Sequence, residues 1–183
     1  MNSVGLVFVK RIGQIEELRQ QDYHGKRIYI EISDMDNYLL QSKIDIGVHK
    51  NLDISQEEFC FDIGYDETGV NLLANSKEQI VAEKIRPILK FGTFSTRYKD
   101  MFDIYYLCDH LDEKKMIDCL NTFIFNDEGM RENNIDDIIR RLDTTFSDSR
   151  YLTRLRKSRT NWIDADVDDV LAKILSFIKG LGK

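Results

Sequence analysis

The sequence KRIYIEI (residues 26–32) decides the class of the fold, because apolar and polar residues alternate along it. Its three isoleucines fall on one face of an extended chain, and Arg27, Tyr29 and Glu31 fall on the other. The sequence KIDIGV (residues 43–48) alternates in the same way, and its two isoleucines and its valine are expected to point inward. Two such segments joined by a short connection predict antiparallel strands.

The sequence on either side extends this sheet. Short apolar runs at residues 6–10 and 59–63 predict two more strands. Between the first run and KRIYIEI, the sequence IGQIEELRQQ (residues 12–21) is interpreted as one or two helical turns. The first third of the chain is therefore expected to form a small, mainly antiparallel sheet.

The rest of the chain has the periodicity of helices. Ser76 is a typical N-cap for KEQIVAEKIRPILK (residues 77–90), whose apolar residues fall near one stripe. We expect Pro87 to kink or divide this helix and Gly92 to end it. Four further helices are predicted, over residues 97–108, 112–125, 135–146 and 166–179. Strands followed by helices are typical of an α+β fold, with a β-rich part at 1–75 and a helical subdomain at 76–183.

The composition is that of an ordinary globular protein. The chain has 183 residues, of which 42% are hydrophobic and 32% charged. Its formal net charge of −6 provides no overall attraction to nucleic acid. Three cysteines without a CxxC pair, and no secretory signal, predict reduced thiols and a cytoplasmic location. No apolar stretch approaches the roughly 18 residues of a membrane span.

Asp45 is the first candidate for chemistry. It lies in the middle of a predicted strand, on the face opposite the isoleucines. A carboxylate on an open sheet face can bind a divalent metal. The local pattern by itself favours the simpler interpretation of a solvent-exposed acid.

A second candidate group lies on the first two predicted helices. If residues 77–91 and 97–108 form a hairpin, Lys84 can face Asp100 or Asp103. A lysine oriented by a carboxylate suits phosphate binding, because its compact charge neutralises triphosphate oxygens. The spacing fits a structural ion pair between packed helices equally well.

Two other motifs carry weaker signals. Asp34-Met35-Asp36 has the Asp-x-Asp spacing of a metal site, but it follows a strand and enters a loop, so we interpret it as a turn. A basic run near Trp162 could contact RNA, although a solvated helix face is slightly favoured; it contains Arg150, Arg154, Arg156, Lys157 and Arg159.

Several of these motifs together resemble one family. The sequence IVAEK (residues 80–84), followed by STRYKDMFDIYYL (residues 95–107), resembles the "AEK…sRxKDxxDl" pattern of the AbiEii-type nucleotidyltransferases, which are toxins of abortive-infection toxin–antitoxin pairs. KIDIG (residues 43–47) is similar to the strand that provides this family's third metal-binding aspartate. The resemblance covers about residues 20–125.

This resemblance implies a polymerase β-like nucleotidyltransferase that transfers a nucleoside monophosphate from an NTP to an acceptor with Mg²⁺. For some members of the family the acceptor is tRNA. Asp45 would share a metal ion, and Lys84 would neutralise the triphosphate beside the phosphate-binding candidates Arg97 and Lys99. Asp100 and Asp103 would position Lys84 or shape the acceptor side.

The chain departs from the family pattern at its start. The family's Gly-Gly or Gly-Ser turn, helix and strand ending in Asp-x-Asp are not found before the first strands. We therefore expect the sheet remnant and the helical C-terminal part of the transferase, truncated and weak or inactive alone. Self-association, or a complementing N-terminal chain, is expected to cover the truncated sheet.

Two alternatives remain open. One is a non-catalytic module that binds RNA, a cognate antitoxin or a second chain. The other is a divergent active transferase that uses Asp34, Asp36 and Asp45.

Overall fold

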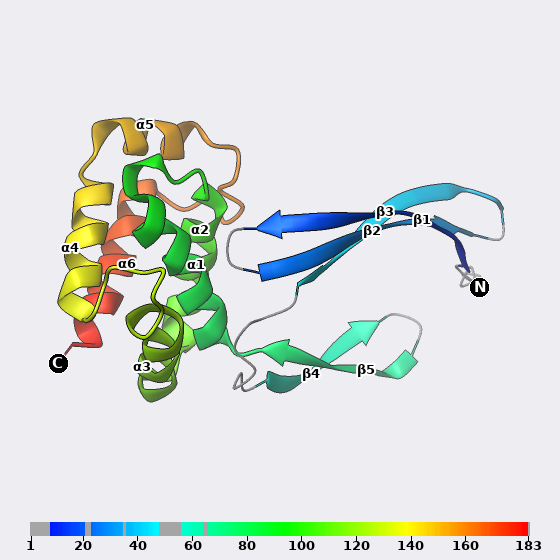
Figure 1. Ribbon diagram of the computed structural model, residues 1–183, viewed down its shortest axis with the longest axis horizontal. Helices are drawn as coiled ribbons and strands as arrows, with labels where there is room; N and C mark the ends of the chain where they lie inside the picture. Colours follow the sequence, from blue (N-terminus) through cyan, green and yellow to red (C-terminus); the bar gives the residue numbers. More distant parts are fainter. Residues whose placement is uncertain (1–7, 21–22, 35, 48–55, 64–65, 183) are drawn as a thin grey trace. The chain divides into compact units, whose positions relative to one another are not determined.

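The computed structural model describes residues 8–20, 23–34, 36–47, 56–63 and 66–182 (Figure 1). The chain divides into two compact units, residues 1–73 and 74–183. The first unit is built of strands and the second of helices, so the expected α+β class is confirmed.

A three-stranded sheet contains both alternating sequences. The strands are β1 (Phe8–Gln20), β2 (Tyr23–Ser33) and β3 (Leu39–Gly47), in the order β1-β2-β3 with antiparallel pairing. Ile28 of β2 lies opposite Ile15 of β1 and Ile44 of β3. The predicted antiparallel arrangement and the isoleucine face are both confirmed.

The predicted helical turns at residues 12–21 are wrong, because strand β1 continues to Gln20. Glu16 and Glu17 lie opposite Arg27 and Lys26, and the pairing register shifts between Ile12 and Ile15. Cross-strand pairs of opposite charge, together with the ladder of backbone hydrogen bonds, outweigh the local helix propensity of this segment.

The isoleucines of β3 do not point into a core. Ile44 and Ile46 are 48% and 49% exposed, and every residue of β3 is exposed. The expectation that they point inward is therefore wrong; Val48, the third member of that group, lies outside the described residues. The alternation does fix which side chains share a face. Among the described strands, however, β3 pairs with β2 alone and forms an edge of the sheet.

A second, two-stranded sheet follows in the chain. It pairs β4 (Gln56–Ile63) with β5 (Asp66–Asn75). The predicted strand at residues 59–63 is part of β4, whereas β5 was not predicted. On β4, Phe59 and Phe61 share one face and their rings pack edge to face, with centroids 4.9 Å apart.

The helical unit has one continuous core. Its α-helices are α1 (Lys77–Phe91), α2 (Tyr98–Leu107), α3 (Glu113–Leu120), α4 (Ile135–Phe146), α5 (Ser149–Lys157) and α6 (Val167–Gly180). Short turns of other helix types lie at Gly92–Phe94, Cys108–His110 and Asn121–Phe125. Helix α6 packs against α2 and α4, and α1 packs against α2 and α3. None of the helices in the described ranges has the length and apolar character of a membrane span.

The predicted ends of α1 are confirmed. The expected division of the helix at Pro87 is wrong, and a kink there stays a prediction. The Ser76 hydroxyl accepts a hydrogen bond from the Gln79 backbone at 3.2 Å, and Gly92 ends the helix with φ of 52°. Helix α1 runs through Pro87. A proline inside a helix costs about 3 kcal/mol. Burial of Ile85 and Ile88 beside it, at ~1.5–3 kcal/mol each, offsets that cost.

Candidate functional site

Lys84 and two aspartates meet where α1 packs against α2. Asp100 and Asp103 are three residues apart, so both project from the same side of α2. Lys84 Nζ lies 3.1 Å from Asp100 Oδ1 and 2.7 Å from Asp103 Oδ2. The predicted contact is confirmed in a stronger form, because one ammonium group bridges both carboxylates.

Three more side chains complete this group. Arg97 Nε donates to Asp100 Oδ2 at 2.8 Å, and Lys99 Nζ lies 3.0 and 2.9 Å from the two Asp103 oxygens. The indole N–H of Trp162 donates to Asp103 Oδ1 at 2.8 Å. We call this set the lysine–aspartate cluster: Lys84, Arg97, Lys99, Asp100, Asp103 and Trp162.

The charges of the cluster are arranged in depth. The side chains of Asp100 and Asp103 are only 4% and 11% exposed, and that of Lys84 is 23% exposed. Arg97 and Lys99 are 61% and 62% exposed. Three cations therefore surround two buried carboxylates, and the cationic groups that reach solvent favour an anion there.

The electrostatics keep the buried pair ionised. Burial acts to lower the pKa of Lys84, but hydrogen bonds to Asp103 and Asp100 outweigh it and the pKa is raised. Burial acts to raise the pKa of Asp103, but hydrogen bonds from Lys84 and Lys99 outweigh it and the pKa is lowered. Both groups are therefore charged at neutral pH.

Sequence reasoning did not place Trp162 in this cluster. It was associated with the basic run, and it lies 59 residues from Asp103 in the chain. Its indole is also 5.3 Å from the ring of Tyr106 on α2 and remains 52% exposed. The segment between α5 and α6 returns to α2 only in the folded chain, so local spacing contains no signal for this contact.

Asp45, the predicted metal ligand, is held by an arginine. Arg27 on β2 lies opposite Asp45 on β3. The Nε and Nη2 atoms of Arg27 donate to the two carboxylate oxygens of Asp45 at 2.7 and 2.8 Å. This pairing lowers the pKa of Asp45. Both Asp45 oxygens accept from a guanidinium in this geometry, and a metal-binding role for Asp45 stays a prediction.

Asp45 belongs to the sheet unit, and Lys84, Asp100 and Asp103 belong to the helical unit. A catalytic site that combines the four residues stays a prediction. In the described ranges, no group of three or more His, Cys, Asp or Glu side chains could hold a metal ion.

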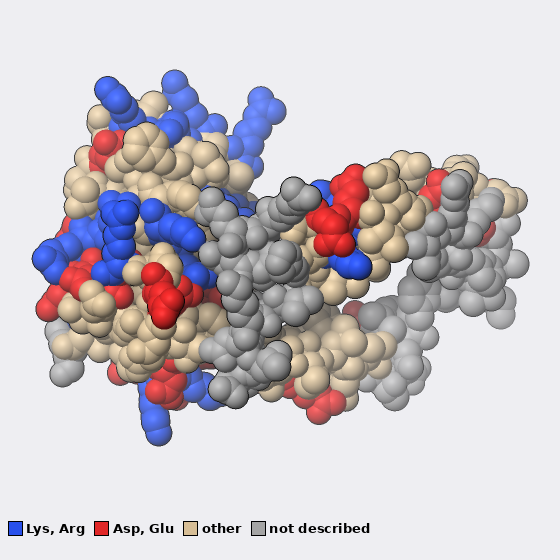
Figure 2. Space-filling view, viewed as in Figure 1, with Lys and Arg blue, Asp and Glu red and all other residues tan. Residues whose placement is uncertain are grey.

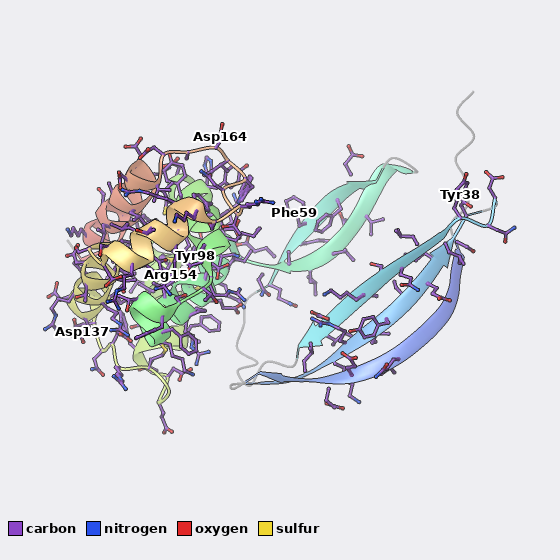
Figure 3. The ribbon with its side chains drawn as sticks, turned by 90° about the horizontal axis from the view of Figure 1, so that it is seen from above. Tyr38, Phe59, Tyr98, Asp137, Arg154 and Asp164 are labelled. Atoms are coloured by element: carbon purple, nitrogen blue, oxygen red, sulfur yellow. The ribbon has the colours of Figure 1, made fainter. Side chains whose placement is uncertain are left out.

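Asp34 and Asp36 form the turn that the sequence predicted. Asp34 Oδ1 accepts hydrogen bonds from the backbone N–H groups of Asp36 at 3.0 Å and Tyr38 at 2.9 Å. Asn37 adopts a left-handed conformation with φ of 63°, which is typical of asparagine in turns. Tyr38, labelled in Figure 3, follows this turn and is exposed.

The basic run lies mainly on α5, where Figure 2 shows Lys and Arg side chains projecting into solvent. Arg156 pairs with Asp168 at 2.6 Å. Arg154, labelled in Figure 3, donates to the Thr93 carbonyl at 2.5 Å. Among the described residues, the other three cations have no side-chain hydrogen bond or ion pair; they are Arg150, Lys157 and Arg159.

Comparison with known proteins gives one family. Residues 3–173 match the family model described as "Nucleotidyl transferase AbiEii toxin, Type IV TA system". No curated protein and no solved structure matches the chain. The match covers most of the sequence, including the strand with Asp45 and the helices with Lys84, Asp100 and Asp103. The chain therefore belongs to the AbiEii nucleotidyltransferase toxin family of type IV toxin–antitoxin systems.

Proposed function

We propose that the lysine–aspartate cluster binds the triphosphate of an NTP, as part of the nucleotidyltransferase-like role of this toxin family. The observation that carries the proposal is Lys84, a partly exposed ammonium group fixed by two buried carboxylates. An ammonium has three N–H donors. Asp100 and Asp103 accept two of them, so the third can point to a phosphate oxygen without a change of geometry.

The outer cations extend this binding surface. Lys99 and Arg97 are anchored by the same two carboxylates, yet more than half of each side chain is exposed. Anchoring fixes their charges near Lys84 and reduces the entropy that is lost when a phosphate binds. A triphosphate, with charges spread along its length, fits three fixed cations better than a single phosphate does.

The reaction implied by the family is transfer of a nucleoside monophosphate to an acceptor, for which tRNA is our candidate. We expect the 183 residues to be weak or inactive by themselves. Asp45 is bound by Arg27, and Asp34 caps two backbone N–H groups of a turn. Asp34, Asp36 and Asp45 have no role in the phosphate binding proposed here. We expect Mg²⁺ to be needed only where transfer occurs.

The second candidate function is a binding module without turnover. The exposed cations Arg150, Lys157 and Arg159 favour an RNA backbone as its ligand. A cognate antitoxin is the partner that a toxin–antitoxin family suggests.

A transfer assay, together with a measurement of tRNA binding by the same variants, separates the two candidates. Labelled NTPs are incubated with total tRNA, Mg²⁺ and one form of the protein. The forms compared are the wild type, Lys99→Ala and the control Lys114→Ala, which lies on the exposed surface of α3. Transfer that Lys99→Ala reduces roughly tenfold or more, equivalent to about 1.4 kcal/mol, supports a working transferase. RNA binding without transfer of any nucleotide supports the module.

A further inference from the structure

A second basic recess lies on the helical unit, away from the lysine–aspartate cluster. We call it the Arg131 pocket. It has a volume of about 230 Å³ and is formed by the end of α1, the connection before α4, and α4 itself. Its lining includes Leu89, Lys90, Met130, Arg131, Glu132 and Arg141. Lys84 and Lys90 are six residues apart on α1, about 120° around the helix, so the two sites use different faces.

Two arginines line this pocket and keep donors that are not used elsewhere in the described part of the chain. Arg141 Nε donates to the Leu89 carbonyl at 2.9 Å, which fixes the plane of the guanidinium. Its two Nη groups, like the whole guanidinium of Arg131, have no hydrogen-bond partner within the described part of the chain. A fixed guanidinium with its Nη donors unused is suited to binding two phosphate oxygens at once.

Glu132 adds a buried carboxylate, a hydrogen-bond acceptor, to the lining of the pocket. It is only 8% exposed, and one carboxylate oxygen accepts from the Arg131 backbone N–H at 3.2 Å. Among the described residues no cation pairs with its carboxylate. A buried carboxylate without a cation is costly unless donors surround it. A ligand that supplied a hydroxyl would satisfy it.

The geometry points to a small phosphorylated hydroxy compound as the ligand of the Arg131 pocket. Its phosphate would bind Arg131 and Arg141, and its hydroxyl would donate to Glu132. At about 30 Å³ per water, the pocket holds roughly eight water-sized groups. That volume accommodates a phosphate with a short hydroxylated carbon chain. This inference does not depend on the proposed function.

The test uses three probes with the full chain: glycerol 3-phosphate, sulfate and glycerol. Affinities are measured by isothermal titration calorimetry. We expect glycerol 3-phosphate to bind at least tenfold more tightly than sulfate, and glycerol not to bind. Sulfate meets the same arginines, but at neutral pH it carries no proton and cannot donate to the Glu132 carboxylate.

Two variants assign the binding to the pocket. Arg131→Gln alters an exposed side chain without a partner, so the fold is retained, and it should weaken glycerol 3-phosphate binding at least tenfold. Glu132→Gln should strengthen sulfate binding and remove the preference for glycerol 3-phosphate. Lys114→Gln on α3, at an exposed residue outside the proposed sites, is the control and should change neither affinity. The inference is overturned if glycerol 3-phosphate fails to bind at millimolar concentration, if Arg131→Gln binds like the wild type, or if Glu132→Gln keeps the preference.

Discussion

Two lysines that contact the same carboxylate should differ widely in their effect on stability. Lys84 and Lys99 approach Asp103 at 2.7 and 2.9 Å, but their side chains are 23% and 62% exposed. Lys84→Met removes two hydrogen bonds between charged groups, each contributing roughly 1.5–3 kcal/mol. It also leaves Asp100 and Asp103 buried with only their outer cations. We therefore expect Lys84→Met to lower the free energy of unfolding by about 3 kcal/mol.

Lys99→Met is the matched comparison. Its ion pair lies at the surface, where such pairs contribute about 0.2–1 kcal/mol. Urea denaturation followed by the fluorescence of Trp162, the only tryptophan and itself bonded to Asp103, measures both variants. Equal losses of stability in the two variants would refute the reasoning, because Lys84 is the more buried lysine and contacts two carboxylates, whereas Lys99 contacts one.

Three further predictions concern single groups. The pKa of Asp103 is lowered in the folded chain, so its stabilising effect is present above its ordinary pKa of 3.8 and is lost as pH falls through the lower folded value. Urea denaturation should therefore show a loss of stability below about pH 4, and this loss should be smaller in Asp103→Asn. Gly92→Ala should lower the free energy of unfolding by about 1–3 kcal/mol, because Gly92 has φ of 52° and an added Cβ would lie 2.7 Å from Arg141 Nη2. A melting temperature equal to that of the wild type would contradict this prediction. Arg27→Gln should raise the pKa of Asp45 toward its ordinary value, as measured by NMR titration of the carboxyl carbon, and an unchanged titration would show that the pair does not persist in solution.

The sequence predicted those parts of the fold that depend on local periodicity. The isoleucines of β2 and β3 alternate, so their shared face could be read directly, and Ser76 and Gly92 mark the ends of α1 by their chemistry. The segment at 12–21 could not be predicted in this way, because its glutamates favour a helix locally and become strand residues only beside Arg27 and Lys26.

In the candidate site, too, contacts that follow from local spacing were predictable and contacts that depend on the folded chain were not. Lys84, Asp100 and Asp103 were predictable as neighbours because two consecutive helices with a short connection form a hairpin, and residues three apart share a face. Trp162 and the Arg27–Asp45 pair were not predicted as partners. The first depends on how α5 and α6 return to α2, and the second on the register between β2 and β3, which decides the residue opposite Asp45.

A comparison of nucleotides with and without the outer phosphates tests directly whether the lysine–aspartate cluster binds a triphosphate. Calorimetric titration of an NTP and the corresponding NMP is compared in the wild type, in Arg97→Gln and in the control Lys114→Gln. We predict that the NTP binds at least tenfold more tightly than the NMP. Arg97→Gln should remove most of this difference in affinity, and Lys114→Gln should preserve it. Equal affinities for the two nucleotides in the wild type, or a preference that survives in Arg97→Gln, would contradict triphosphate binding at the lysine–aspartate cluster.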